Sequence, residues 1–515
     1  VPEDHSQAMP EPSIDTKSGE RKQKIRWPPN NNKADWDQFD FDVDSILNTS
    51  LAGGIDKKAE AMATIMYNVG KERFGLEEVR QKQQKSTGHR NRRQQERASI
   101  RRDLRQLSKR YRVAPEEERA ALAELRQGMR ERLKILNRAE RSRKRRKERA
   151  RARARFTANP FQFTSKLLGK KSSGKLLAEK AEVENHLKEV HSDEKRDEEL
   201  PEQPKLIQVC EPEHIFDESE PTAKEVRDVI QKARAASAPG PNGIPYKVHK
   251  NCPRLTRRLW KHIRVIWRRG RLADSWNQAE GCYIPKEENS KNLSQFRTIS
   301  LLNVEGKILL SVMANRMTRY MLDNNYVDIA VQKGGVPGVS GCIEHTSVLT
   351  QIIREAREGK GELAVIWLDL ANAYGSMPHK LVQLTLEKYH VPAKTRHLLE
   401  EYFNRLELRF SIGDYTTSWQ RLEVGIVTGC TISVILFAAA MNLLVKSTEK
   451  MSRGPWMRAG IRQPPVRAFM DDMTISTKTA IEARWTLKEI EELISWAMMK
   501  TNHQRRKVLC RRKEE

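Results

Sequence analysis

The pattern of hydrophobic and polar positions divides the first part of the chain into segments of different character. Residues 1–24 are polar, contain three prolines and show no periodicity, so we expect them to be disordered. Residues 25–80 carry aromatic residues and then an apolar stripe with spacings of three and four, which predicts a small helical unit. The stripe comprises Ala59, Met62, Ile65, Met66 and Val69.

Residues 81–155 combine a thin apolar seam with a dense run of positive charges. The seam comprises Leu104, Leu107, Tyr111, Leu122, Leu125, Leu133 and Ile135. This pattern predicts one or two long basic helices, broken near Pro115 and ending in the run Arg141–Arg155.

The rest of the chain changes from a mixed texture to that of a folded domain. Residues 156–236 begin near the boundary signal Asn159-Pro160-Phe161 and include a stretch rich in Pro and Glu, so we interpret them as a linker or N-terminal extension. From residue 237 to about 500, apolar strands, turns and helical stretches alternate, which predicts a folded core. The longest apolar stretch, Ile432–Val445, is too short to span a bilayer and predicts a buried helix.

The charge of the chain points to a polyanionic partner. Lys and Arg number 95 against 68 Asp and Glu, a formal net charge of +27, which favours nucleic acid over a membrane surface. Residues 81–155 hold 28 of these cations against 9 acids, so most of the excess lies there. A solvated charged helix and a helix that binds phosphate backbones both remain open. The candidate nucleic-acid-binding residues are Arg141, Arg143, Lys144, Arg145, Arg146 and Lys147.

The cysteines and the basic run also bear on the cellular compartment. The six cysteines are scattered and none forms a Cys-x-x-Cys pair, which argues against disulfides or a zinc knuckle and favours a reducing compartment. The basic run Arg141–Arg155 also fits a nuclear-localisation signal, so we expect synthesis in the cytoplasm and action in the nucleus.

Carboxylates stand at the ends of two apolar runs. Leu363–Leu368 is typical of a strand buried on both faces, and Asp369 follows it directly. Asp471 and Asp472 lie between two short β-rich runs, which predicts a hairpin with both acids at its tip. Taken singly, an Asp at a strand end often caps the next helix and an Asp in a turn is common. Two adjacent acids repel one another, however, and a divalent cation would relieve that cost.

If the two elements are neighbours in one sheet, three carboxylates converge. That arrangement suits two Mg²⁺ ions in an in-line phosphoryl transfer, with Mn²⁺ as an alternative ion. Hard oxygen ligands without His or Cys argue against zinc. Asp369, Asp471 and Asp472 are therefore the candidate catalytic and metal-binding residues.

Several motifs carry a resemblance to reverse transcriptases. Three of them resemble the palm motifs in order and separation: Leu368-Asp369-Leu370-x-x-Ala373-Tyr374, Gly425-x-x-x-Gly429-Cys430-Thr431-x-Ser433, and Phe469-Met470-Asp471-Asp472. Others resemble non-long-terminal-repeat (LINE-like) retrotransposons: Ser237–Pro245, Tyr283-Ile284-Pro285-Lys286, Phe296–Asn303 with Lys307, Gln332-Lys333-Gly334, Gly341–His345 and Tyr374–His379. The resemblance covers about residues 237–500 and suggests the lineage with a restriction-like endonuclease.

The resemblance implies roles for individual residues. Asp369, Asp471 and Asp472 would hold the metal ions. Tyr374 would be the aromatic gate that favours deoxynucleotides, although a core aromatic at the start of a helix is the alternative. Lys286 and Arg297 would bind the incoming triphosphate. Gly429 would let the backbone approach the base pair, with an ordinary loop glycine as its alternative.

The chain also departs from the family pattern. Thr298 stands where the family usually has Pro, Thr428 where many members have Gln, and Met470 where Ala is commoner. The family's Lys-Pro-x-Lys-Ser stretch is missing after Met499, and residues 501–515 are polar and basic. We hypothesise that this tail is truncated or frameshifted and that the thumb is absent.

Together these features predict an α+β fold with reverse-transcriptase palm and fingers behind a helical, strongly basic N-terminal extension. The predicted function is that of an RNA-directed DNA polymerase module of a non-LTR retrotransposon. Its partners would be an RNA template, a DNA primer or target and deoxynucleoside triphosphates, with no membrane and no obligate protein partner. A catalytically inactive nucleic-acid-binding remnant and a nuclease that uses the same acids are the alternatives.

Overall fold

The computed structural model describes residues 22–77, 92–168, 174, 176–286, 289–339, 341–413 and 415–511. The chain forms two compact units. The larger comprises Val1–Glu77, Lys175–Lys286 and Ser290–Glu515, and the smaller Glu78–Gly174 with Glu287–Asn289. The disorder predicted for residues 1–24 falls almost wholly outside the described residues.

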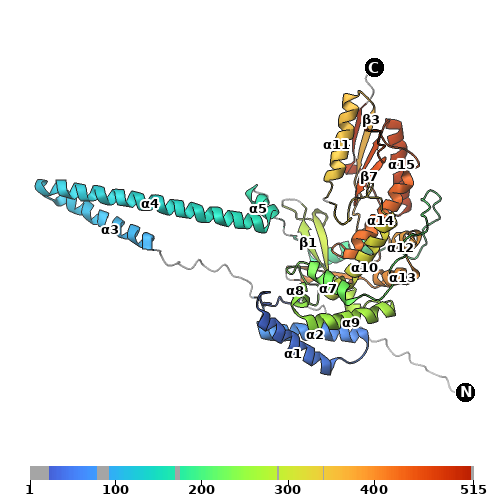
Figure 1. Ribbon diagram of the computed structural model, residues 1–515, viewed down its shortest axis with the longest axis horizontal. Helices are drawn as coiled ribbons and strands as arrows, with labels where there is room; N and C mark the ends of the chain where they lie inside the picture. Colours follow the sequence, from blue (N-terminus) through green and yellow to red (C-terminus); the bar gives the residue numbers. More distant parts are fainter. Residues whose placement is uncertain are drawn as a thin grey trace. The chain divides into compact units, whose positions relative to one another are not determined.

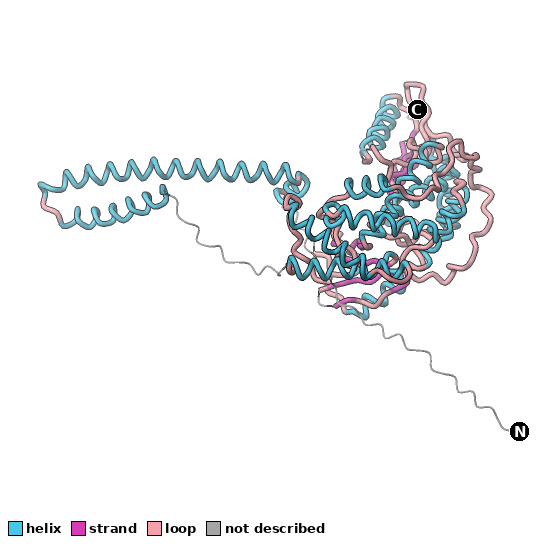
Figure 2. The backbone as a smooth tube through the Cα atoms, turned by 60° about the horizontal axis from the view of Figure 1, so that its bottom comes forward, coloured by secondary structure: helices cyan, strands magenta, loops and turns pink. Residues whose placement is uncertain are grey.

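The smaller unit is a helical hairpin. Its helices are α3 (Arg92–Val113), α4 (Glu116–Ala158) and α5 (Pro160–Leu167). The predicted break at Pro115 is confirmed, since Pro115 is the N-cap of α4 and three glutamates follow it in the first turn, where the helix dipole favours negative charge. α3 and α4 run alongside each other as two long helices (Figure 2).

The apolar seam of this hairpin differs from the predicted one. Leu125 and Ile135 are 52% and 61% exposed, whereas Leu136 and Ala114 are buried. The residues that do face inward, Leu122, Leu133 and Leu136 among them, keep the spacing of three and four that one helical face requires. Ile135 belongs to the neighbouring face, so its prediction as a seam residue is wrong.

The N-terminal helices belong to the core of the larger unit. They are α1 (Lys33–Ser50) and α2 (Ile55–Phe74), and the predicted stripe is confirmed in that Ala59, Met62 and Met66 are buried. Trp27, Trp36, Phe39 and Phe74 form an aromatic cluster with ring centroids 5.6–6.3 Å apart. Both helices also pack on α9 (Pro253–Arg269). A separate unit at 25–80 is thus the wrong description, because these apolar faces pair with a helix about 200 residues away.

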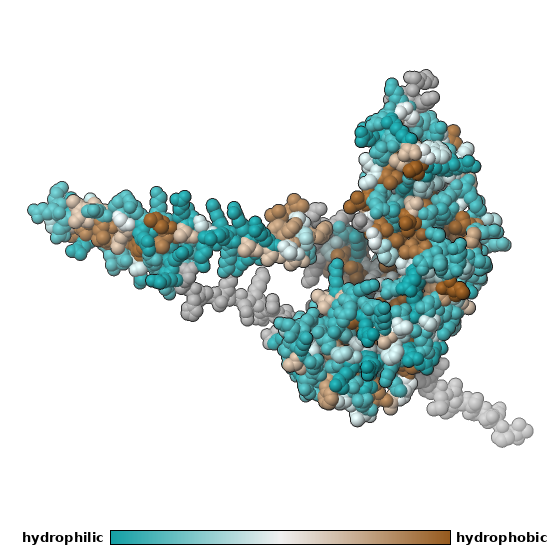
Figure 3. Space-filling model, viewed as in Figure 1, coloured by the Kyte–Doolittle hydropathy of each residue, from teal (hydrophilic) through white to brown (hydrophobic). Residues whose placement is uncertain are grey.

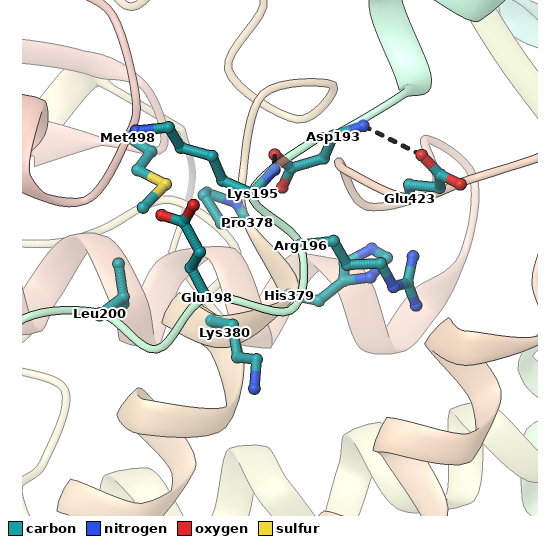
Figure 4. Close-up of a pocket in the computed structure, with 10 residues that line it drawn as sticks. All are labelled: Asp193, Lys195, Arg196, Glu198, Leu200, Pro378, His379, Lys380, Glu423 and Met498. Carbon is teal, nitrogen blue, oxygen red and sulfur yellow. Dashed lines mark hydrogen bonds between the residues drawn. The ribbon is translucent and has the colours of Figure 1, made fainter.

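Most of the described part of the linker predicted at 156–236, namely residues 176–236, is also packed rather than extended. Its helices are α6 (Lys180–His191) and α7 (Ala223–Lys232), with Val183, Leu187 and Ile230 buried. The intervening segment lines a small pocket against α12 (His379–Lys388) (Figure 4). There the Asp193 N–H donates to the Glu423 carboxylate over 3.1 Å.

His379 lies in this pocket as a structural residue. Its Nε2 is 2.8 Å from the Gly425 carbonyl and its ring stacks on Phe403 at 4.7 Å. Burial lowers the pKa of His379 to about 4, so the imidazole is neutral at physiological pH. The pocket therefore ties the extension to the core, and the linker prediction is wrong for this segment.

Two sheets form the framework of the larger unit. The first has the order β2-β1-β4-β5, with β6 also paired to β4. Its strands are β1 (Gln278–Pro285), β2 (Phe296–Leu302), β4 (Glu407–Ile412), β5 (Tyr415–Thr416) and β6 (Gln420–Arg421). The second has the order β7-β8-β3-β9, all antiparallel, and its strands are β3 (Leu363–Leu368), β7 (Val466–Phe469), β8 (Asp472–Thr477) and β9 (Lys507–Arg511).

Helices cover the second sheet as predicted for a palm. Figure 1 shows α11 on one side of β3 and β7 and α15 on the other. Ile352 of α11 packs on Leu363 and Val365, because β3 is apolar on both faces. The remaining helices are α8 (Tyr246–Asn251), α10 (Val304–Asp323), α11 (Ile343–Glu358), α13 (Ala393–Asn404), α14 (Thr431–Thr448) and α15 (Ala480–Trp496).

Helix α14 confirms the predicted buried helix at Ile432–Val445. Among the described residues it is the one helix long and apolar enough to cross a membrane, but 83% of it is buried within the unit. Its apolar residues are buried all round, as in the central helix of a core.

Strand β9 is a departure from the sequence-based expectation. Residues 501–515 are predicted to be a truncated or frameshifted tail, yet Lys507–Arg511 pairs with β3 from Trp367 to Leu363 and forms the edge of the second sheet. The side chains of β9 are mostly exposed, so backbone hydrogen bonds hold it rather than a buried apolar face. A strand of this kind has no hydrophobic alternation that a sequence pattern could reveal.

Candidate active site

The three predicted carboxylates come together at one end of the second sheet. β3 pairs with β8 so that Leu368 lies opposite Met473, which places Asp369 beside Asp472. In the β7–β8 hairpin Phe469 lies opposite Asp472, leaving Met470 and Asp471 as the two turn residues. The predicted strand, the hairpin and their adjacency in one sheet are confirmed.

The charges of these acids act on one another. Burial raises the pKa of Asp471, and the neighbouring Asp472 and Asp369 raise it further, whereas Arg297 lowers it. Burial and Asp369 likewise raise the pKa of Asp472. Like charges held this close destabilise one another unless a cation lies between them. The site is therefore an acidic end of a sheet that favours a positive ligand.

Asp369 already has cationic and amide partners from the C-terminal segment. Its Oδ2 accepts from Arg505 Nη1 over 3.3 Å and from Asn502 Nδ2 over 3.4 Å. Its carbonyl accepts from the Asn502 N–H over 2.7 Å, and the Ala371 N–H donates to the Lys500 carbonyl over 2.8 Å. Residues 500–505 therefore run directly beside the first carboxylate.

The three aspartates are suitable ligands for a divalent metal ion, but their side chains are not close enough together to form a metal site in this structure. Aspartate oxygens are the ligands that Mg²⁺ prefers, and mutual repulsion marks where the positive charge is needed. Within the parts of the chain that the structure describes, no group of three or more His, Cys, Asp or Glu side chains is arranged closely enough to hold a metal ion. In addition, Asp369 is paired with Arg505 over 3.3 Å.

Gln332 holds the hairpin turn in place. Its Oε1 accepts the N–H of Met470 and of Gly334, each over 2.9 Å, and its Nε2 donates to the Met470 carbonyl over 3.3 Å. The side chain is fully buried, and Met470 has a positive φ of 59°. An otherwise unfavourable turn conformation is thus fixed by two hydrogen bonds to one amide, which also bonds to Gly334.

Sequence patterns alone assign no role of its own to Gln332. Its motif contributed only to the family resemblance, since nothing local shows that it reaches a turn 138 residues away. A Cβ on Gly334 would lie 2.4 Å from the Met470 nitrogen, so the glycine of this motif allows the close approach. Both features depend on tertiary packing.

Tyr374 lies between the core and the acids. Its ring stacks on Phe437 with centroids 4.8 Å apart and planes 5° apart. Burial raises the pKa of Tyr374, with Asp471 as the next contributor. The side chain is therefore a packed aromatic, as in the alternative interpretation, and its hydroxyl is also close enough to Asp471 to be affected by it.

The two cations predicted to bind phosphate have different surroundings in the structure. Arg297, on β2 opposite Ile284, is exposed, and its charge lowers the pKa of Asp471, so it lies within electrostatic range of the acidic site. The Lys286 ammonium, just after β1, donates to the Ser294 carbonyl over 2.8 Å. Arg297 is thus brought to the site, whereas Lys286 contacts the loop that leads into β2.

Gly429 is required by contact with β2. Its φ is +97°, and a Cβ there would lie 2.7 Å from the Ser300 carbonyl oxygen. Ser300 N–H donates to the Thr428 carbonyl over 2.9 Å, and the Thr428 hydroxyl donates to the Thr298 carbonyl over 2.8 Å. The two threonines that depart from the family pattern therefore join the same two segments.

The six candidate nucleic-acid-binding residues lie on α4 of the smaller unit. All are exposed, and Arg143 forms an ion pair with Glu140 over 2.7 Å. Figure 3 shows mainly hydrophilic side chains along α3 and α4. This helix presents its cations to solvent, where a flexible polyanion can reach them.

Comparisons with known proteins show what this core is similar to. Residues 284–514 match the family described as "Reverse transcriptase (RNA-dependent DNA polymerase)". The Pol polyprotein of the type-1 retrotransposable element R2 of Nasonia vitripennis is 22% identical over 268 residues, 52% of this chain and 25% of that protein. That of element R2DM of Drosophila melanogaster is 22% identical over 268 residues, 52% and 24%.

The chain spans about a quarter of the length of these curated relatives. Among solved structures, apo telomerase from Candida Tropicalis, truncated from its C-terminal domain, matches with a TM-score of 0.35 and 11% identity over 46% of this chain and 50% of that one. The predicted resemblance to non-LTR reverse transcriptases is confirmed, and the matched residues include β9.

Proposed function

Since residues 284–514 form a reverse transcriptase domain related to those of R2 non-LTR retrotransposons, we propose that this chain is an RNA-directed DNA polymerase. It adds deoxynucleotides to the 3′-hydroxyl of a primer on an RNA template. The observation that carries the proposal is the convergence of Asp369, Asp471 and Asp472 at one end of an antiparallel sheet.

In this proposal the three aspartates hold two Mg²⁺ ions, with Mn²⁺ as an alternative. When bound, such ions supply an activated hydroxyl and neutralise charge on the reacting phosphates. Arg297 binds the incoming triphosphate, because its exposed guanidinium already lies close enough to act on Asp471. Lys286 acts with it once its loop approaches the nucleotide.

The surrounding residues position the reacting groups. Tyr374, stacked on Phe437, offers a fixed aromatic edge near Asp471 that would exclude a ribose 2′-hydroxyl. Gln332 keeps Asp471 and Asp472 at the tip of the hairpin. Gly429 keeps the loop before α14 against β2, so the nucleotide site has a rigid floor.

Nucleic acid is held largely by charge in this proposal. The exposed cations from Arg141 to Lys147 bind phosphates of the RNA template or the DNA target without reading sequence. Template identity is read by base pairing. The same run directs the protein to the nucleus, where a chromosomal target lies.

One contact favours the alternative of an inactive nucleic-acid-binding remnant. Arg505 bonds to Asp369, and a metal ion at Asp369 would have to displace it. The pair is 3.3 Å long and Arg505 is 67% exposed, so its free-energy cost is small, about 1 kcal/mol or less. A divalent ion bound by three carboxylates would exceed that amount, which is why the polymerase is favoured.

Primer extension tests the proposal directly. Purified protein is given a poly(rA)/oligo(dT) template-primer, dTTP and Mg²⁺, beside the double variant Asp471→Asn, Asp472→Asn. Extension by the natural chain that is lost in the variant would support the polymerase. Hybrid binding that weakens with salt, without extension in Mg²⁺ or Mn²⁺, would support the remnant instead.

A further inference from the structure

A hollow between α1 and α9 has no part in the proposed polymerase site. The two helices run side by side within the larger unit (Figure 1). The hollow has a volume of about 590 Å³ and is lined by Asp44, Asn48, Pro253, Arg254, Arg257, Arg258 and Lys261. Four of these seven residues are cationic and one is acidic.

One cation of the hollow is fixed by the opposite helix. The Arg258 guanidinium bonds to the Asp44 carboxylate and to the Asn48 side-chain oxygen, and it also donates to the Asp44 carbonyl over 3.1 Å. A guanidinium held on several sides presents its remaining surface in a constant direction. Because Asp44 pairs with Arg258, it neutralises only one of the four positive charges.

The other three cations contrast with those further along α9. Arg264 and Arg268 pair with Glu220, and Arg269 pairs with Asp56. Arg254, Arg257 and Lys261 form no salt bridge with any residue that the structure describes, and all three are exposed at the hollow. About one helical turn separates each of these three residues from the next, so their charges add along one face of the helix.

An aromatic ring lies beside one of the residues that line the hollow. Phe41 lies one turn before Asp44 on α1 and is 50% exposed. The Arg254 guanidinium lies over its ring at 5.2 Å from the centroid. A half-exposed aromatic ring with a guanidinium over it, beside further cations without salt bridges, is a combination that binds unpaired bases together with their phosphates.

We propose that this hollow binds single-stranded nucleic acid. Backbone phosphates contact Arg257 and Lys261 within it, Arg258 supplies a fixed donor, and a base stacks at Phe41 and Arg254. The volume exceeds that of one phosphate group, so the site takes a stretch of chain rather than a free anion. A duplex keeps its bases stacked inside and could use only the charges. The inference does not depend on polymerase activity.

The first experiment measures binding of a labelled 20-nucleotide single-stranded RNA by fluorescence anisotropy over a range of salt concentrations. The double variant Arg257→Gln, Lys261→Gln removes two exposed cations. Loss of two phosphate contacts lowers the slope of log affinity against log salt by about 1.4 for a single strand. Affinity at low salt falls in parallel.

The matched control is Arg484→Gln, Lys488→Gln on α15. These residues are also exposed cations four residues apart on one helix, so the net charge changes by the same amount. The slope should stay closer to that of the natural chain in the control. An equal loss in both variants would show a general charge effect and would overturn the proposal. Thermal melting of each variant verifies that the fold is retained.

A second variant tests the aromatic part. Phe41→Ala should weaken binding of single-stranded RNA and of single-stranded DNA but leave binding of a duplex of equal length unchanged. RNA that contains 4-thiouridine should crosslink to α1 or α9 in the natural chain and less in Phe41→Ala. Two results would overturn a nucleic-acid site here. One is an equal loss of duplex and single-strand binding in Phe41→Ala. The other is that polyglutamate displaces the labelled RNA from Arg257 and Lys261 as well as unlabelled RNA does.

Discussion

The sheet that carries the three aspartates and the α3–α4 hairpin use charge in opposite ways. In the sheet, acids lie at the end of a strand buried on both faces, and a fully buried glutamine fixes the turn that bears two of them. In the hairpin, cations lie on long helices with little buried surface. The first arrangement depends on exact placement and the second on the number of charges. Single substitutions should therefore matter greatly in one and little in the other.

The largest effect should follow from neutralising the hairpin acids of the sheet. Asp471→Asn with Asp472→Asn should lower primer extension by at least about 10²-fold, since metal ions contribute several kcal/mol to such transfers. Steady-state incorporation of dTTP gives the measurement. Glu358→Gln, an exposed acid on α11, is the matched control, and comparable loss there would contradict the assignment.

The same double variant should be more stable than the natural chain when no divalent ion is present. The folded-state pKa of each aspartate is raised, so folding favours the protonated forms. Their contribution to stability is therefore greatest below the unfolded-state pKa and is lost as pH rises through the folded-state value. Urea unfolding in EDTA at pH 7 should show the gain, and at acid pH the two proteins should converge.

Gln332→Leu comes next, because it leaves the N–H groups of Met470 in the turn and of Gly334 without their acceptor. The free energy of unfolding should fall by about 1–3 kcal/mol. Primer extension should also fall, because Asp471 loses its position. Denaturant unfolding and extension are measured together. Gln351→Leu, whose amide bonds to Glu355 on an exposed helix, should change neither. Normal extension by Gln332→Leu would show that the turn does not need the glutamine.

Gly429→Ala tests whether contact or conformation sets the need for glycine. The new Cβ would lie 2.7 Å from the Ser300 oxygen, and the backbone φ is +97°. The close contact and the backbone conformation therefore both make the substitution unfavourable. Gly460→Ala has a φ of +74° with nothing within 4 Å and isolates the conformational term, about 1 kcal/mol. Unfolding free energies should fall further for Gly429→Ala. Equal losses of unfolding free energy in the two variants would show that contact with β2 does not contribute to the need for glycine.

These contrasts also show how far the sequence alone predicts the molecule. The strand before Asp369, the hairpin of Asp471 and Asp472 and the break at Pro115 follow from local patterns, and the structure bears them out. Local patterns could not identify Gln332, whose partner is 138 residues away. Nor could they predict β9, which pairs through its backbone with exposed side chains. The missed features are long-range contacts made by polar groups.

The contact between Arg505 and Asp369 should have a smaller effect. Arg505→Ala removes a competitor for the carboxylate, so Mn²⁺ should bind up to about fivefold more tightly, in line with 1 kcal/mol or less for an exposed pair. Electron paramagnetic resonance of free Mn²⁺ measures this without any turnover. Lys507→Ala removes the same charge two residues further on. If both variants bind Mn²⁺ alike, general charge rather than the contact is responsible.

The smallest effect should come from a single cation of the α3–α4 hairpin. Lys144→Gln should lower the salt slope for single-stranded RNA by about 0.7, because one phosphate contact is lost among many. Replacing all six cations from Arg141 to Lys147 should lower it by up to six times that amount, with roughly equal shares from each. A salt titration of each single variant measures these shares. If one residue lowered the slope much more than the others, binding to this helix, like the chemistry of the sheet, would depend on the exact position of a side chain. Equal shares would keep the two regions as opposites, one fixed by geometry and the other by the sum of its charges.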